Sequence, residues 1–307
     1  MAKNKSARPL KWEVFIRKRA SATQGVPPGK DELKWVSNAV TFIYGDSDAV
    51  LVDTLLSDQQ NSELADWIEA RHKTLRWIYV THAHPDHFFG LALLLKRFPT
   101  ARAIALPQVV ALMRKIITPE FVAENWEKRF PGQIPETLVA AEEVGPDGFE
   151  LEGDKLVPIE VGHTDTDHTT SLFVPSIGLV VAGDAAYNGT HPYLGESDHA
   201  GRLEWIAAID KISALQPRHV VVGHGPLDPD HAAAHLVATR KYIETFDRLD
   251  SQTATAQELY DQMIELYPDR INPGSLWGAA HAAKAFFRPE VGLKASTKLI
   301  PTEGNTT

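Results

Sequence analysis

Residues 81–87 read Thr-His-Ala-His-Pro-Asp-His, and this stretch decides which fold we expect. It follows a short apolar run that is typical of a buried strand. His82 and His84 are two residues apart at the strand end, so their side chains face the same way, while Asp86 and His87 begin the next turn and face a second position. Imidazole and carboxylate are the ligands that zinc accepts when no thiolate is present. The stretch therefore predicts ligands for two neighbouring metal ions.

Three more residues with metal-binding side chains stand at the ends of later expected strands, and each follows a glycine. They are His163, Asp184 and His224. Ligands that leave several strand ends converge at one edge of a sheet, where the sites of α/β proteins usually lie. Each residue taken alone has an equally good structural explanation, but together they complete a two-metal site.

The rest of the chain alternates between short strands and helices. Two β-rich runs at 40–44 and 49–52 flank a turn-forming cluster at 45–48 and predict a hairpin. Further strands are expected at 77–80, 103–105, 156–161, 171–174, 179–182 and 220–222, and helices at 91–98, 203–212, 231–249 and over most of 254–287. Strands mixed with helices in this way predict a layered α/β architecture.

The segment 107–150 differs from its surroundings, because prolines separate short helical stretches. We interpret it as a helical flap inserted into a domain spanning 21–250, with 251–307 as a helical C-terminal segment on the same domain that ends in a frayed tail. The candidates for an apolar substrate pocket are Phe121, Trp126, Phe130 and His191. The alternative is that the aromatic residues only pack the flap against the domain.

Composition narrows the choices further. The chain has 307 residues, 13 histidines and no cysteine, which excludes disulfides, thiolate zinc sites, iron–sulfur clusters and a cysteine nucleophile. The net charge is −9, which disfavours a nucleic-acid or membrane-surface protein. Seven basic residues against one acidic residue give residues 1–19 a charge of +6, so we expect 1–20 to be a solvated basic extension. Without an apolar stretch of signal-peptide or membrane-spanning length, we expect a cytoplasmic location.

Residues 81–87 resemble the His-x-His-x-Asp-His signature of the metallo-β-lactamase superfamily, and four later motifs match in the family's order over roughly 35–250. These motifs are Asp53, Gly162-His163-Thr164, Gly183-Asp184 and Gly223-His224. The resemblance implies a four-layer αββα sandwich with a dinuclear site between the sheets, holding two zinc ions, with iron or manganese as alternatives. It further implies that His82, His84 and His163 hold one ion, that Asp86, His87 and His224 hold the other, that Asp184 bridges both, and that Asp53 orients a ligand histidine.

The resemblance also implies an activity, namely a metal-dependent hydrolase in which a metal-bridging hydroxide cleaves an ester, lactone or related acyl bond of a fairly apolar small molecule. Asp86 would handle the proton of the leaving group. Tyr187, three residues after Asp184, is similar to the lactonase arrangement in which a tyrosine donates to the substrate carbonyl. Its alternative is a tyrosine that only packs at a loop start. His168 comes five residues after His163, whereas family members often have a histidine after four, so its role is left open.

Several alternatives remain at this point. A glyoxalase II-like thioesterase or a phosphodiesterase would use the same site, and an iron-dependent redox enzyme would use the same fold. A non-catalytic binding protein usually has eroded ligands, whereas all seven expected positions are filled here. The expected partner is a small-molecule substrate, with no nucleic acid and no membrane, and a homodimer is left open. The lack of cysteine removes the relatives that use a cysteine ligand to hydrolyse β-lactams.

Overall fold

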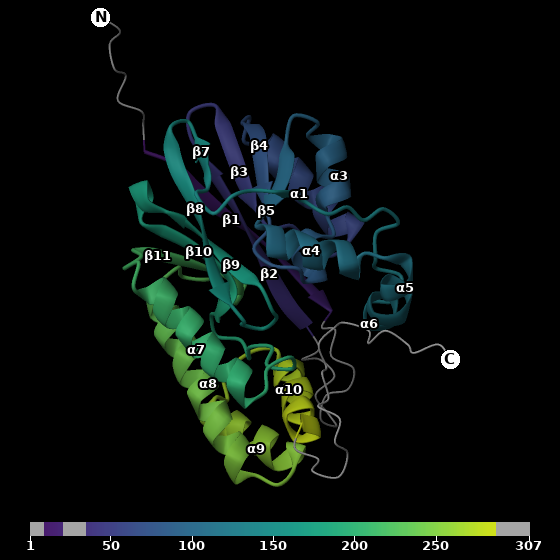
Figure 1. Ribbon diagram of the computed structural model, residues 1–307, viewed down its shortest axis with the longest axis vertical. Coiled ribbons are helices and arrows are strands. Elements are labelled where there is room, and N and C mark those ends of the chain that lie inside the picture. Colours follow the sequence, from purple (N-terminus) through teal and green to yellow (C-terminus); the bar gives the residue numbers. More distant parts are fainter. Residues whose placement is uncertain (1–8, 21–34, 287–307) are drawn as a thin grey trace, which may run out of the picture.

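The computed structural model describes residues 9–20 and 35–286. Two β-sheets lie face to face in this part of the chain, and helices cover the outer face of each sheet (Figure 1). This is the expected αββα sandwich of the metallo-β-lactamase fold. The apolar layer between the sheets includes Ile43, Val52, Tyr79, Leu172 and Val181, all of them buried.

The first sheet has six strands whose order in space follows their order in the chain. They are β1 (Lys11–Ala20), β2 (Trp35–Tyr44), β3 (Asp48–Val52), β4 (Thr74–Tyr79), β5 (Arg102–Ala105) and β6 (Glu142–Glu143). The first three strands pair antiparallel, and β3 to β6 pair parallel. The expected hairpin is confirmed as β2 and β3.

The second sheet has five strands in the spatial order β11-β10-β9-β8-β7. They are β7 (Phe149–Leu151), β8 (Asp154–Gly162), β9 (Thr169–Val174), β10 (Leu179–Tyr187) and β11 (His219–His224). Within this sheet, β10 and β11 pair parallel and the other neighbours pair antiparallel. The two sheets meet near β2 and β11, so the strand ends of both reach one edge of the sandwich.

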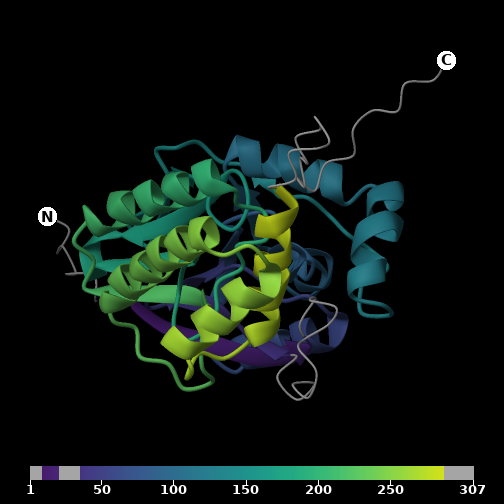
Figure 2. The same cartoon turned by 90° about the horizontal axis from the view of Figure 1, so that it is seen from below.

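Helices pack on both outer faces. The first sheet is covered by α1 (Asp58–Glu69), α3 (Leu91–Arg97) and α4 (Pro107–Ile116), and the second by α7 (His199–Ser213) and α8 (Ala234–Gln252). Two further helices, α9 (Ala256–Leu266) and α10 (Pro273–Phe286), pack on α8 and on each other. Shorter elements are α2 (Pro85–Phe88), α5 (Pro119–Phe121), the π-helix η2 (Val122–Trp126), α6 (Glu127–Arg129) and the 3₁₀ helix η3 (Pro175–Ile177). Figure 2 shows α10, in yellow, between the helices of the second sheet and the α4–α6 segment. Within the described ranges, no helix has the length and apolarity needed to cross a bilayer.

Two expectations are corrected. Residues 11–20 are not a solvated extension, because they pair along their whole length with β2 as the edge strand β1. The proposed flap at 107–150 is helical only as far as Arg129. Its last part contributes to two short strands instead, since Glu142–Glu143 pairs with β5 and Phe149–Leu151 pairs with β8. Strands of two or three residues have no sequence periodicity of their own and form because a neighbouring strand offers hydrogen bonds. The frayed tail falls on 287–307, outside the described residues.

Candidate metal centre

The stretch 81–87 begins just after β4 and runs into α2, and every residue in it is buried. His84 is the N-cap of α2, and Pro85 occupies the first helical turn, where a missing backbone N–H costs nothing. The chain therefore turns sharply after His84 and carries Asp86 and His87 to the opposite side of the site. One short stretch can therefore supply candidate ligands to two neighbouring metal positions.

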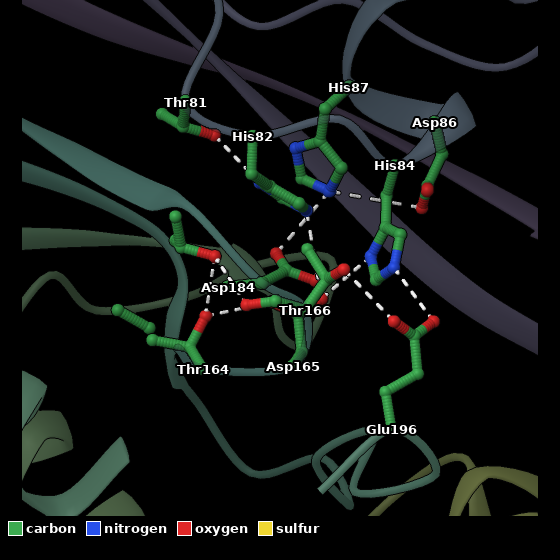
Figure 3. A network of polar contacts seen from close by, with 12 residues as sticks. Thr81, His82, His84, Asp86, His87, Thr164, Asp165, Thr166, Asp184 and Glu196 are labelled. Atoms are coloured by element: carbon green, nitrogen blue, oxygen red, sulfur yellow. Dashed lines mark hydrogen bonds and ion pairs between the residues drawn. The ribbon is translucent and has the colours of Figure 1, made fainter. Parts of the chain in front are cut away.

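The first group of candidate ligands contains His82, His84, Asp165 and Asp184. One ligand atom of each lies within 4.8 Å of those of the others. Nδ1 of His84 is 2.7 Å from Oδ2 of Asp165, and Nε2 of His82 is 3.6 Å from the same oxygen. Figure 3 shows these side chains converging from the segment that follows β4, from β10 and from the segment that follows β8.

The second group contains Asp86, His87 and His224, whose ligand atoms also lie within 4.8 Å of one another. Asp184 contacts this group as well, with Oδ2 2.9 Å from Nε2 of His224 and Oδ1 3.4 Å from Nε2 of His87. Asp184 therefore lies between the two groups, in the position expected of a bridging carboxylate.

Four atoms of this centre are buried and make no hydrogen bond of normal geometry, and their only polar contacts are ion pairs within the centre. They are Nε2 of His82, Nε2 of His87, Oδ2 of Asp165 and Oδ1 of Asp184. Buried polar atoms without partners are costly and rare in proteins. Nitrogen and oxygen atoms gathered at such short range are what a divalent cation requires. The residues present therefore fit metal ions in both groups.

The outward-facing nitrogen of each histidine in the centre is held by another residue. These contacts are His82 Nδ1 to Thr81 Oγ1 (2.9 Å), His84 Nε2 to Glu196 Oε1 (3.3 Å), His87 Nδ1 to Asp53 Oδ2 (2.9 Å) and His224 Nδ1 to the Ser37 carbonyl (2.6 Å). Such contacts fix the ring orientation and leave the other nitrogen for a metal. Asp53 also accepts hydrogen bonds from the backbone N–H and hydroxyl of Thr81. The structure thus places Asp53 behind a candidate ligand histidine, and adds Glu196, which no sequence motif marked.

Burial and neighbouring charged groups shift the pKa values of the side chains in the centre. Burial alone would raise the pKa of Asp184, but His224 and His87 hold it well below its usual range. Burial is also the largest influence on His82, and together with the neighbouring His87 it lowers the pKa of His82 well below its usual value. At His84, His87 and His224 burial also disfavours the charged ring, but the neighbouring carboxylates overcome it and raise the pKa of each histidine. Metal ions bound here would therefore have to displace protons from these rings.

Arg19 and Asn38 are functional candidates that the sequence analysis missed. Arg19, near the end of β1, places its guanidinium 2.5 Å from Oδ2 of Asp86, and Nδ2 of Asn38 donates to the same oxygen over 2.6 Å. Both side chains of the Arg19–Asp86 pair are nearly buried. Arg19 overcomes the effect of burial and, with His87 and His224, keeps the pKa of Asp86 well below its usual range. Only the strand pairing of β1 brings this arginine to the site.

The structure does not bring His163 into either group. Its Nδ1 is 2.8 Å from Oδ1 of Asp167, and its Nε2 is 2.8 Å from Oγ of Ser197. Asp165, two residues further along the chain, is fully buried in the first group instead. Gly162 has a left-handed φ of 96°, and the turn that follows it directs His163 toward α7.

A cavity of about 360 Å³ opens onto both groups. Its lining includes Trp126 and Phe130, as expected of the helical segment, and also Tyr187. The Tyr187 hydroxyl donates to Oδ2 of Asp184 over 2.9 Å. Phe121 packs behind Trp126, with ring centroids 5.7 Å apart. His191 is fully buried and contacts the Tyr242 hydroxyl at 2.8 Å, so it is not part of the lining.

Comparisons with known proteins agree with this architecture. The sequence profile of the Metallo-beta-lactamase superfamily matches residues 33–224. A metallo-beta-lactamase family protein from Thermus thermophilus has a similar structure, with a TM-score of 0.61 and 18% identity over 89% of this chain and 92% of that one. DIM-1 metallo-beta-lactamase has a TM-score of 0.56 and 19% identity, over 78% of this chain and 99% of that one. The mono-zinc form of FIM-1 from Pseudomonas aeruginosa has a TM-score of 0.54 and 17% identity, over 78% of this chain and 97% of that one. No curated protein sequence matches the chain significantly.

Proposed function

The chain belongs to the metallo-beta-lactamase superfamily, and from this premise we propose that it is a hydrolase that holds two divalent metal ions and cleaves an ester, lactone or related acyl bond of a small, partly apolar molecule. The observation that carries the proposal is the shared cavity. His84, Asp184 and His224 line it from the two ligand groups, and Trp126 and Phe130 line it with apolar surface. A substrate resting on the aromatic side chains would present its reactive bond to both groups.

The chemistry expected there follows from the donor set. Two divalent cations bound side by side would supply an activated water and a positive charge for a developing oxyanion. Asp86 lines the cavity, and Arg19 and Asn38 hold one of its oxygens, so Asp86 is the carboxylate best placed to hold a proton for the leaving group. Because Arg19 keeps the pKa of Asp86 well below its usual range, Asp86 would accept the proton only transiently and pass it on to the leaving group.

Tyr187 has two roles open to it. Its hydroxyl donates to Asp184, which would orient that carboxylate, and it also lines the cavity, where it could donate to a substrate oxygen. A Tyr187→Phe variant separates the roles. Loss of an oxyanion donor lowers kcat on carbonyl substrates by about 100-fold with metal content unchanged, whereas loss of carboxylate orientation lowers metal affinity.

The activity is tested by loading metal-free protein with zinc, manganese or iron(II) and supplying aryl esters, lactones, thioesters and phosphodiesters. Asp184→Asn is the control, because it keeps the shape of the bridging residue and removes its charge. Hydrolysis of esters or lactones above the level of the control supports the proposal. Turnover of only thioesters or phosphodiesters would move the function to those classes. Oxygen uptake by the iron form without any hydrolysis would replace the hydrolase with a redox enzyme.

A further inference from the structure

The segment 162–169, which links β8 to β9, offers four metal-binding side chains but sends only one to the metal centre. The four are His163, Asp165, Asp167 and His168. Asp165 is fully buried, and its Oδ1 accepts a hydrogen bond from the Thr164 hydroxyl over 2.9 Å. Its Oδ2 has no hydrogen-bond partner and lies 2.7 Å from Nδ1 of His84. One oxygen of Asp165 is therefore fixed in place and the other faces the first ligand group.

His163 has no free ring nitrogen with which to replace Asp165. Both ring nitrogens are engaged, one by Asp167 and one by Ser197. The Ser197 hydroxyl also contacts the Thr164 carbonyl over 2.9 Å, which ties this ring to the backbone beside Asp165. The backbone of α7 closes on the ring, since a Cβ atom added to Gly201 would lie 2.8 Å from Nε2 of His163. These contacts hold the ring of His163 beside α7 and away from the first ligand group.

With Asp165 in the first group, the two halves of the centre offer the same kinds of donor. One half has His82, His84 and Asp165, and the other has His87, His224 and Asp86, with Asp184 between them. Each half thus supplies two imidazoles and one carboxylate. Imidazole-rich sites suit zinc, carboxylates suit manganese and magnesium, and two histidines with one carboxylate are typical of non-haem iron(II).

We propose that Asp165 is the third protein ligand of the first metal ion, and that this carboxylate lowers the preference of that half for zinc over manganese or iron(II), so that both halves take the same kind of ion. The inference rests on the metal-binding part of the proposed function and adds to it the class of metal. It replaces the expectation of a zinc site with three histidines, which depended on His163.

The experiment counts ions on the full chain. Protein stripped with a chelator is loaded with Mn²⁺ or Zn²⁺, and the bound metal per chain is measured after buffer exchange. The wild type is expected to saturate at two Mn²⁺ as well as at two Zn²⁺. Asp165→Asn should lose one ion, and His163→Gln, which keeps a hydrogen-bonding side chain, should retain two. A His163→Gln protein that loses an ion while Asp165→Asn keeps both would overturn the ligand assignment.

Competition between the metals tests selectivity. Asp165→His restores a three-histidine half, and its affinity ratio of Zn²⁺ to Mn²⁺ should rise on the order of tenfold over the wild type. An unchanged ratio in a variant that binds two ions would overturn the metal-class part of the inference. If Asp165→His does not fold, the ion count of the wild type tests the metal class by itself. A wild-type chain that binds two Zn²⁺ but only one Mn²⁺ at saturation would contradict the inference that both halves take the same kind of ion.

These readouts do not depend on turnover. A protein whose ion count follows Asp165 but that hydrolyses nothing keeps this inference and loses the proposed function. A hydrolase whose ion count follows His163 keeps the function and loses this inference.

Discussion

The segments 81–87 and 162–169 leave strands of different sheets and deliver ligands to the same centre by different means. In 81–87, a strand end and a proline-started helix follow one another directly, and all four candidate ligands reach the two groups. In 162–169, the turn is held by contacts with residues 196–201, and one candidate in four reaches the centre. Local backbone geometry positions the first segment, whereas tertiary packing selects the residue that the second segment contributes.

The largest expected effect comes from breaking the first segment. His82→Ala removes an imidazole that has no substitute nearby, so the first metal ion should be lost. A metal ion contributes several kcal/mol of transition-state stabilisation, so hydrolysis should fall by about 10³-fold. Metal analysis and kcat/KM on the best substrate check this, with His281→Ala, an exposed histidine of α10, as the control. Two ions retained in His82→Ala would show that the stretch does not set this half of the centre.

Arg19→Ala tests whether the first segment is held by local geometry alone. It removes the nearly buried partner of Asp86, and breaking a buried ion pair costs about 3–5 kcal/mol. The loss should be smaller with metal bound, because the ions compensate the same carboxylate. Urea unfolding of the metal-free and metal-loaded forms measures both values.

Arg17→Ala is the matched control on the same strand. The Arg17–Glu63 pair is about 40% exposed on both sides, so its loss should cost no more than about 1 kcal/mol. Equal losses for Arg17→Ala and Arg19→Ala would mean that the contact between Arg19 and Asp86 does not support the segment.

The difference between the segments explains how much the sequence could predict. The sandwich, most strands and the dense motif followed from patterns within about ten neighbouring residues. The role of Asp165 did not, because four candidate ligands stand within six residues and only Ser197 and the approach of Gly201 distinguish them. Arg19 was equally hidden, because pairing of β1 with β2 carries it to a site 67 residues away in the chain. The spacing of residues along the chain reflects local geometry, whereas contacts between residues far apart in the chain produce no recognisable sequence pattern.

His191 also follows the end of a strand, but it belongs to neither ligand group of the metal centre. Burial, and next the nearby Arg270, lowers the pKa of His191 to about 3. The unfolded chain therefore takes up a proton before the folded one does. The stability that depends on a neutral His191 is complete above about pH 6.5 and is lost as the pH falls toward 3, by about 2 kcal/mol between pH 6.5 and 4.5.

His191→Gln should flatten this part of the stability profile, measured by urea unfolding at several pH values on metal-free protein. His281→Gln, on the exposed face of α10, should leave the profile as it is. A His191→Gln profile as steep as that of the wild type would assign the acid sensitivity to the histidines of the metal centre instead.

Gly201→Ala tests the packing that selects Asp165 in the second segment. The new Cβ would lie 2.8 Å from Nε2 and 3.0 Å from Cδ2 of His163, so the ring or α7 must move, at a cost of about 1–3 kcal/mol. Because the ring is tied to the backbone at Thr164, the shift should also weaken binding of the first ion. The double variant Gly201→Ala/His163→Ala removes the clash, so its free energy of unfolding should exceed the value expected from adding the two single losses. Purely additive losses would mean that the approach of α7 does not act through His163, and the choice of Asp165 would then have to come from the turn itself.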